Sequence, residues 1–150
     1  MGIEKDISQA KFRNEYQKAA INLIYTFNWA NEKMKKLLDD YDITSQQFNI
    51  LRILRGAGKP ISTLQIRQRM LDKMSDTSRI VDRLLKKGWV IKVTCEGDRR
   101  LVDVSISESG LSLLNRIDAH QEEMDSMFKN LDEQEALTLN KLLDKLRNVE

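Results

Sequence analysis

The hydrophobic positions of the first forty residues follow a helical repeat. They recur at steps of three and four residues, at Phe12, Tyr16, Ala19, Leu23, Phe27, Ala30, Met34 and Leu37. This stripe predicts one long amphipathic helix over about 6–39. At 1.5 Å per residue such a helix is on the order of 50 Å long, more than one small domain needs for its own packing. We therefore expect part of its apolar face to pack against a second chain.

The middle of the chain predicts three shorter helices. Capping boxes of the type Ser/Thr-x-x-Gln begin the first two, at Thr44 and at Ser62. Ser75 is the expected N-cap of the third helix, and Gly88 ends it. This third helix carries hydrophobic residues on one side and charged or hydroxyl side chains on the other. A helix with that division is expected to meet a polar partner on its outer side.

A change of period follows the third helix. Hydrophobic and polar residues alternate over 91–95 and again over 102–106, which is typical of strands. The polar segment 96–100 between them predicts the tip of a hairpin. Three helices followed by a two-stranded wing with arginines at its tip predict a winged helix-turn-helix over 44–106.

Two further helices are predicted after the wing. Ser107 caps a helix that continues to Phe128, and a capping box at Asp132 begins the last one. The predicted fold is therefore mostly α with a small β-wing: a winged helix-turn-helix domain flanked by N- and C-terminal dimerisation helices over 6–39 and 108–149.

Size and composition limit the class of protein. The 150 residues, 41% of them hydrophobic, suffice for a single domain over 1–150. No run of about 18 apolar residues could span a membrane, and residues 1–6 lack the pattern of a secretion signal. We therefore expect a cytoplasmic protein without a membrane partner.

Residues for metal or nucleophilic chemistry are scarce. The chain has one cysteine, Cys95, and one histidine, His120, so it can form neither an internal disulfide nor a zinc site of the usual kind. Cys95 shares a strand face with Ile91 and Val93 and is interpreted as a small buried residue rather than a redox sensor. His120 is expected on a helix surface. These observations predict no cofactor, no metal and no catalytic residues, and so no enzyme.

The distribution of charge is more informative than the net charge of +2. Residues 52–106 hold thirteen Lys and Arg against six Asp and Glu, whereas residues 107–150 hold five against ten. Residues 1–51 are balanced, with seven of each. The predicted winged domain is therefore basic, as a surface that contacts phosphates must be. Chance placement of charges on solvated helices is the alternative explanation.

Four blocks of sequence, in order along the chain, resemble the multiple-antibiotic-resistance regulator (MarR) family of transcription factors. They are Thr44-Ser45-Gln46-Gln47-Phe48, residues 78–84 followed by Lys86-Lys87-Gly88-Trp89-Val90, Asp98-Arg99-Arg100, and Ser107-Glu108-Ser109-Gly110. The resemblance implies a homodimer whose first and last helices interlock and whose two winged domains bind successive major grooves of a pseudo-palindromic operator. The family often has a glycine in the turn before the recognition helix, where this chain has Leu71-Asp72-Lys73-Met74.

The first turns of the predicted recognition helix supply one group of candidate DNA-binding residues. Side chains there can reach base edges, and the helix dipole favours a phosphate. The candidates are Ser75, Asp76, Ser78, Arg79 and Arg83. Alternatives remain for three of them: Ser75 also caps the helix, Asp76 could only order an arginine, and Arg83 could pair with Asp82 or the wing.

The wing supplies the second group. Arg99 and Arg100 suit the narrow and electronegative minor groove, and Asp98 resembles the acidic residue with which the family braces its wing. A merely soluble turn is the alternative interpretation of these charges.

The sequence thus predicts a DNA-binding transcriptional regulator. In particular, it predicts a repressor that binds double-stranded DNA and that a small phenolic or anionic effector releases from the DNA. Aromatic residues lie where family members bind such effectors, although most of them are interpreted as core: Tyr25, Phe27, Trp29, Tyr41 and Phe48. A winged-helix module that binds an acidic protein is the runner-up, and an enzyme is a remote third.

Overall fold

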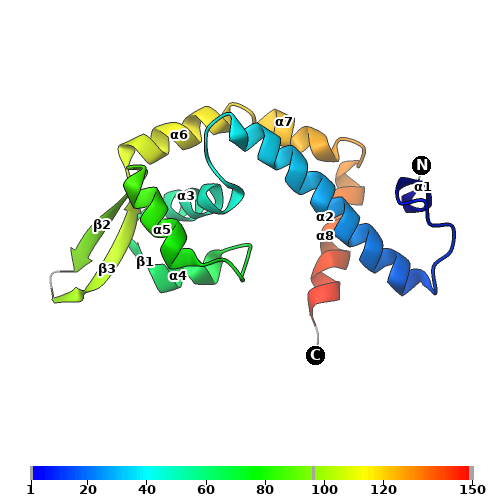
Figure 1. Ribbon diagram of the computed structural model, residues 1–150, viewed down its shortest axis with the longest axis horizontal. Coiled ribbons are helices and arrows are strands. Elements are labelled where there is room, and N and C mark those ends of the chain that lie inside the picture. The colour runs from blue at the N-terminus through cyan, green and yellow to red at the C-terminus, as the bar shows by residue number, and fades with distance from the viewer. Residues whose placement is uncertain (1, 96, 149–150) are drawn as a thin grey trace.

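The computed structural model describes residues 2–95 and 97–148, which form an arch (Figure 1). The elements are α1 (Ile3–Asp6), α2 (Glu15–Asp39), α3 (Ser45–Ala57), β1 (Ile61–Ser62), α4 (Thr63–Arg69), α5 (Thr77–Lys86), β2 (Val90–Cys95), β3 (Asp98–Ile106), α6 (Glu108–Asp118), α7 (Gln121–Asp125), the 3-10 helix η1 (Ser126–Phe128) and α8 (Glu133–Arg147). One end of the arch contains α3 to β3, and the other contains α2, α8 and α1.

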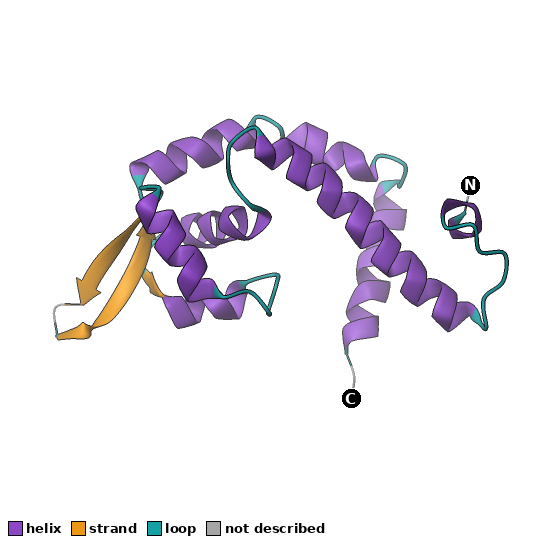
Figure 2. Cartoon of the chain, viewed as in Figure 1, coloured by secondary structure: helices purple, strands orange, loops and turns teal. Residues whose placement is uncertain are grey.

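The first of these ends is a winged helix-turn-helix domain, which contains every strand that the structure describes (Figure 2). Its sheet is antiparallel, with strand order β1-β3-β2. The helices α3, α4 and α5, the three strands and helix α6 all contribute to one core. The most completely buried side chains of this core include Ile50, Leu51, Ile66, Leu84, Val104, Leu114 and Ile117. The predicted fold class, mostly α with a small β-wing, is confirmed.

Three capping boxes begin helices where the sequence predicted them. The side chains of Thr44, Ser62 and Asp132 each accept a hydrogen bond from the backbone N–H three residues later. In each case the Gln or Glu at that third position accepts one from the backbone N–H of the capping residue. These pairs satisfy N–H groups that a helix end otherwise leaves without partners.

The predicted helix over 6–39 is wrong at its beginning. The long helix starts at Glu15, and α1 is a separate short helix. Asn14 is the reason: its side chain accepts a hydrogen bond from the backbone N–H of Gln17 and caps the helix there. Ser8 has a φ of 54°, in the left-handed region that a continuous helix cannot contain.

The predicted helix from Ser107 to Phe128 is also interrupted. The helical ladder ends after Asp118, because the amide of His120 bonds the carbonyl of Ile117 instead of that of Arg116. The hydroxyl of Tyr41 donates to the Arg116 carbonyl oxygen at 3.3 Å beside this point. We call this interruption between α6 and α7 the α6–α7 break.

The wing differs from the prediction in two ways. A third strand, β1, pairs with β3, with Ile61 opposite Val104. The strand β3 begins at Asp98, which lies opposite Cys95, so the backbone of Arg99 and Arg100 is in the strand rather than in the tip. The tip is therefore shorter than the predicted 96–100.

Helix α6 joins the winged domain to the rest of the arch. The guanidinium of Arg55 on α3 forms two hydrogen bonds with the carboxylate of Asp118, at 2.6 and 3.3 Å. At the other end of α6, the backbone N–H of Ser107 donates to the carbonyl of Trp89 at 3.0 Å. Both ends of α6 are thus attached to the domain that carries the wing.

Candidate nucleic-acid interface

Helix α5 presents the polar surface that the sequence predicted. Val81 and Leu84 are buried beneath it, whereas Ser78, Arg79 and Arg83 are exposed. The inward side chains fix the helix on the core, and the outward side chains are available to a ligand. This division is what a recognition helix requires, since base edges are reached only by side chains that the fold does not use.

The N-cap of α5 is Asp76 and not Ser75. The carboxylate of Asp76 accepts a hydrogen bond from the backbone N–H of Arg79 at 3.2 Å. Its second oxygen lies 3.9 Å from the Arg79 Nε, so Asp76 also orders that guanidinium. Ser75 is half-buried, and its hydroxyl donates to the carbonyl of Asp72 in the preceding turn. An aspartate and a serine at adjacent positions are both good caps, and their order was not decidable from the sequence.

Arg79 and Arg83 differ in how far they are restrained. The Arg79 side chain is 71% exposed and keeps its contact with Asp76. Arg83, one turn later, makes no ion pair with any residue that the structure describes. The predicted alternative in which Arg83 pairs with Asp82 is therefore absent here. Two cations thus project from one face of α5 toward solvent.

Part of the predicted wing contact lies outside the described side chains. Asp98 is half-buried at the start of β3. The side chains of Arg99 and Arg100 are outside those that the structure describes, as is that of Cys95, so their predicted roles stay predictions. The backbone register nevertheless places both arginines at the end of the hairpin farthest from α5 and α6 (Figure 1).

A groove between α4 and α5 adds a cation that the sequence analysis did not single out. Its volume is about 500 Å³, and its lining includes Thr63, Leu64, Arg67, Ser75, Asp76, Thr77 and Ser78. Arg67 on α4 thus shares this groove with the first residues of α5. The hydroxyl of Thr77 is buried there and has no hydrogen-bond partner among the described residues. The sequence shows Arg67 one turn after Thr63 on the same helix, but it does not show that α5 lies beside them.

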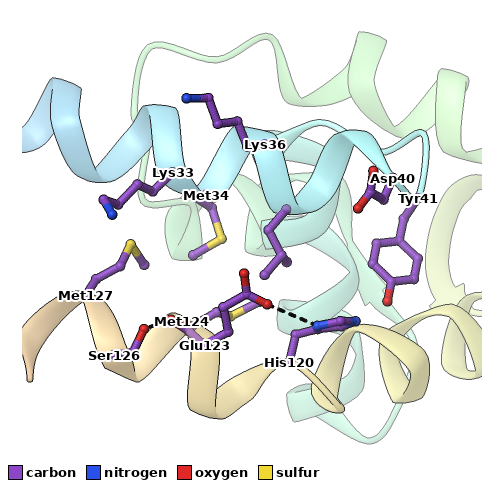
Figure 3. Close-up of a pocket in the computed structure, with 11 residues that line it drawn as sticks. Lys33, Met34, Lys36, Asp40, Tyr41, His120, Glu123, Met124, Ser126 and Met127 are labelled. Carbon is purple, nitrogen blue, oxygen red and sulfur yellow. Dashed lines mark hydrogen bonds and ion pairs between the residues drawn. The ribbon is translucent and has the colours of Figure 1, made fainter.

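A second hollow, which we call the α2–α7 pocket, lies beside the α6–α7 break (Figure 3). Its volume is about 320 Å³, and it is lined mainly by the last turns of α2 and by α7 and η1. Met34, Met124 and Met127 contribute thioethers, and Lys33 extends its ammonium group between the two helices. The rings of Tyr41 and His120 meet edge to face, with centroids 5.9 Å apart, at one end of the pocket.

The predicted effector aromatics do not gather in one place. Tyr41 lines the α2–α7 pocket and Phe48 belongs to the core. The expectation that most of them are core is wrong for Tyr25, Phe27 and Trp29, which are 40%, 64% and 39% exposed on α2. These three residues lie on the part of α2 that extends beyond the winged domain, where the rest of the described chain leaves their side chains partly exposed.

Other kinds of site find no support among the described residues. Those residues contain no group of three or more His, Cys, Asp and Glu side chains that could hold a metal ion. His120 instead contacts Glu123, with 3.2 Å between Nδ1 and the carboxylate oxygen. No described helix is both long and apolar enough to cross a lipid bilayer.

Comparison with known proteins agrees with this geometry. The model of the MarR family matches residues 41–101. The multiple antibiotic resistance protein MarR of Salmonella typhimurium is 32% identical over 126 residues, which cover 77% of this chain and 84% of that protein. A crystal structure of a mutant MarR from E. coli complexed with operator DNA superposes with a TM-score of 0.78 at 25% identity, covering 92% of this chain and 99% of that one.

A further solved structure shares the fold at lower identity. The organohalide-sensing RdhR transcriptional regulator, in its 2,4-dichlorophenol bound form, has a TM-score of 0.82 at 20% identity and covers 93% of this chain and 86% of its own. The winged domain, its exposed recognition helix and these similarities together identify the molecule. The chain belongs to the MarR family of DNA-binding transcriptional regulators, whose members are not enzymes.

Proposed function

We propose that this protein is a homodimeric repressor that binds a pseudo-palindromic operator and is released by a small phenolic or anionic effector. The observation that carries the proposal is the exposed outer face of α5, where Arg79 in the first turn and Arg83 in the last turn face solvent within a basic segment. In this proposal α5 enters the major groove. Arg99 and Arg100, with Asp98 bracing them, enter the adjacent minor groove.

The dimer is supported by the apolar side chains that one chain leaves uncovered. On α2 and α8 large hydrophobic residues face solvent at fractions that a stable monomer avoids. They include Tyr16, Leu23, Ile24, Phe27, Leu137, Leu139, Leu142 and Leu146. Phe27 and Leu142 are 64% and 59% exposed. A second copy would bury both stripes at once, since a two-fold interface uses the same surface on each subunit.

Sedimentation of the intact chain tests the dimer. We expect twice the 17.5 kDa mass of one chain at micromolar concentration. Phe27→Glu places a charge within the uncovered stripe and should give monomers or strongly weakened dimers. Ile91→Glu is the matched control, because Ile91 is 50% exposed on the wing, outside the stripe. A folded monomer for the wild type would remove the basis for a palindromic operator.

A salt titration on DNA tests the interface itself. Arg100→Ala removes one wing cation from each protomer, so the slope of log affinity against log salt should flatten by about 1 to 2. Arg79→Ala should cost roughly 1 to 3 kcal/mol and relax base preference at one symmetric position of each half-site. Lys141→Ala removes the same charge from α8, away from the winged domain, and should change neither property.

The measurement is fluorescence anisotropy on a selected operator and on random duplex. Half-sites about one helical turn apart are expected from the two-fold symmetry. If Arg79→Ala and Arg100→Ala both bind the operator as the wild type does, with the same slope, the basic face is not the DNA face. The protein would then be better described as a winged-helix module for an acidic protein partner.

The α2–α7 pocket supports the effector part of the proposal. Its volume of about 320 Å³ lies within the range of small-molecule sites, and its thioethers suit an aromatic ring. Because the pocket adjoins the α6–α7 break, an occupant can favour one orientation of α7 and α8 relative to the winged domain. For release, the effector must bind the non-operator form of the dimer more tightly than the operator form.

Two probes test this pocket, 2,4-dichlorophenol and benzoate, each titrated into the protein–operator complex. Lys33→Ala should weaken release by benzoate more than release by the phenol, because the Lys33 ammonium lies in the pocket. Lys35→Ala is the control, since Lys35 lies on the same helix and pairs with Asp39 but does not line this pocket. Equal effects of the two variants would place the effector elsewhere.

A further inference from the structure

The turn between α4 and α5 presents two large apolar side chains to solvent. Leu71 is 86% exposed and Met74 is 93% exposed. Met70, at the start of this turn, is instead buried in the core at 2%. We call residues 71–74 the apolar turn. It projects beyond the ends of the two helices that it joins (Figures 1 and 2).

The apolar turn is held in place by its own hydrogen bonds. The backbone N–H of Leu71 donates to the side-chain oxygen of Asn49 at 2.9 Å, and that of Met74 donates to the Asp72 carboxylate at 3.0 Å. The Lys73 ammonium donates to the carbonyl of Gln68. No residue of the turn has a positive φ, so it forms without the glycine that the family often uses there. A turn ordered in advance loses little conformational entropy when it binds a partner.

The position of the apolar turn is continuous with the DNA-binding helix. Met74 is followed directly by Ser75 and by Asp76, the N-cap of α5, and both of these line the groove that also contains Arg67. In winged helix-turn-helix proteins the N-terminal residues of the recognition helix contact base edges. A side chain just before that N-terminus is therefore carried to the same groove of the duplex.

The major groove offers one apolar group to such a side chain, the C5-methyl of thymine. We propose that Met74 contacts a thymine methyl in each half-site and contributes to the choice of operator sequence. This inference rests on the proposed function, because it requires α5 to enter the major groove. The unbranched thioether side chain suits the task, since it is long and adapts to the surface that it meets. Residues 67–79 hold four Lys and Arg against two Asp, and this excess of positive charge favours the duplex over an apolar protein surface as the occupant.

Replacement of thymine by deoxyuridine tests the contact, because it removes only the methyl group. Each symmetric pair of thymines in the selected operator is replaced in turn. Loss of one buried methyl corresponds to about a fourfold loss of affinity, so a pair in the two half-sites should cost roughly 15-fold in the wild type. Met74→Leu should retain this loss. For Met74→Gln and for Met74→Ala, the affinities for the thymine operator and the deoxyuridine operator should differ by no more than about 1.5-fold, since neither side chain has enough apolar surface to bury the methyl group.

Leu71→Ala is the matched control within the same turn and should keep the wild-type response to deoxyuridine. The inference is overturned if no thymine pair shows a methyl effect in the wild type. It is equally overturned if the effect persists in both Met74→Gln and Met74→Ala. Failure of the proposed function looks different: the wild type would then bind operator and random duplex alike.

Discussion

Gly110 allows α6 to lie against the start of the wing, and replacing it by alanine tests that packing. A Cβ at this position would lie 2.2 Å from the carbonyl oxygen of Trp89 and 2.8 Å from Cγ1 of Ile106. Ordinary contact begins near 3.4 Å, so the helix or the strand must move by about 1.2 Å. The clash involves backbone, which cannot turn aside as a flexible side chain can.

The structure indicates what such a movement would cost. Overpacking of this kind costs about 1 to 3 kcal/mol. The displaced segment also holds the bond from the Ser107 N–H to the Trp89 carbonyl and the N-cap bond from Gly110 to the Ser107 hydroxyl, at 3.0 and 3.1 Å. Each contributes about 1 kcal/mol net. Alanine recovers up to about 1 kcal/mol through its helix propensity. We expect Gly110→Ala to lower the free energy of unfolding by about 2 to 4 kcal/mol.

Urea unfolding at a fixed protein concentration, followed by far-UV circular dichroism, measures this change. Gly56→Ala is the matched control, because Gly56 is in helix α3 and a Cβ there meets nothing within 4 Å. It should stabilise the protein by about 0.5 to 1 kcal/mol. If Gly110→Ala unfolds within 0.5 kcal/mol of the wild type, with the control behaving as expected, the close approach of α6 to Trp89 is not a constraint on the fold.

Three further predictions concern other contacts. A double-mutant cycle of Arg55→Met and Asp118→Asn should give a coupling free energy of about 1 kcal/mol in urea unfolding, and a value near zero would show that the bidentate pair does not hold α6. The hydrogen bond from Lys18 lowers the pKa of Glu4. This contact therefore stabilises the fold at pH values above the ordinary glutamate pKa, and its contribution is lost as the pH falls through the lowered pKa. A carbon-detected NMR titration should show a higher Glu4 pKa in Lys18→Met than in the wild type. Cys95→Ser should leave any response of operator binding to peroxide unchanged, and loss of that response at preserved stability would reassign the protein as a redox sensor.

The features that were predictable from the sequence depend on neighbouring residues. The capping boxes at Thr44, Ser62 and Asp132 involve partners three residues away, so the letters alone indicate both members of each pair. The polar outer face of α5 was likewise visible in the spacing of its hydrophobic residues. Such local patterns placed three helix starts at the correct residues, and they placed the start of the recognition helix within one residue.

The features that were missed depend on residues far apart in the chain. The strand β1 exists because Ile61 and Ser62 meet β3 more than forty residues later. At the α6–α7 break, the Tyr41 hydroxyl contacts the carbonyl of Arg116, which is 75 residues away in the chain. A periodic stripe of hydrophobic residues contains no information about either contact. The groove with Arg67 was missed for the same reason, since it exists only once α4 and α5 are packed together.

The α6–α7 break makes α6 a short lever attached to the winged domain. From its start at Glu108 to its end at Asp118 the helix has 11 residues, about 16 Å of length. A rotation of roughly 12° at the break therefore displaces the far end of α6 by about 3 Å, close to the axial rise of one base pair. In the proposed homodimer, movement of both protomers would change the distance between the two recognition helices by up to about 6 Å, close to the axial rise of two base pairs. For the proposed operator, the angle at the α6–α7 break would thus set which half-site spacing fits the protein, although no residue of the break lies on the winged domain's DNA-binding face.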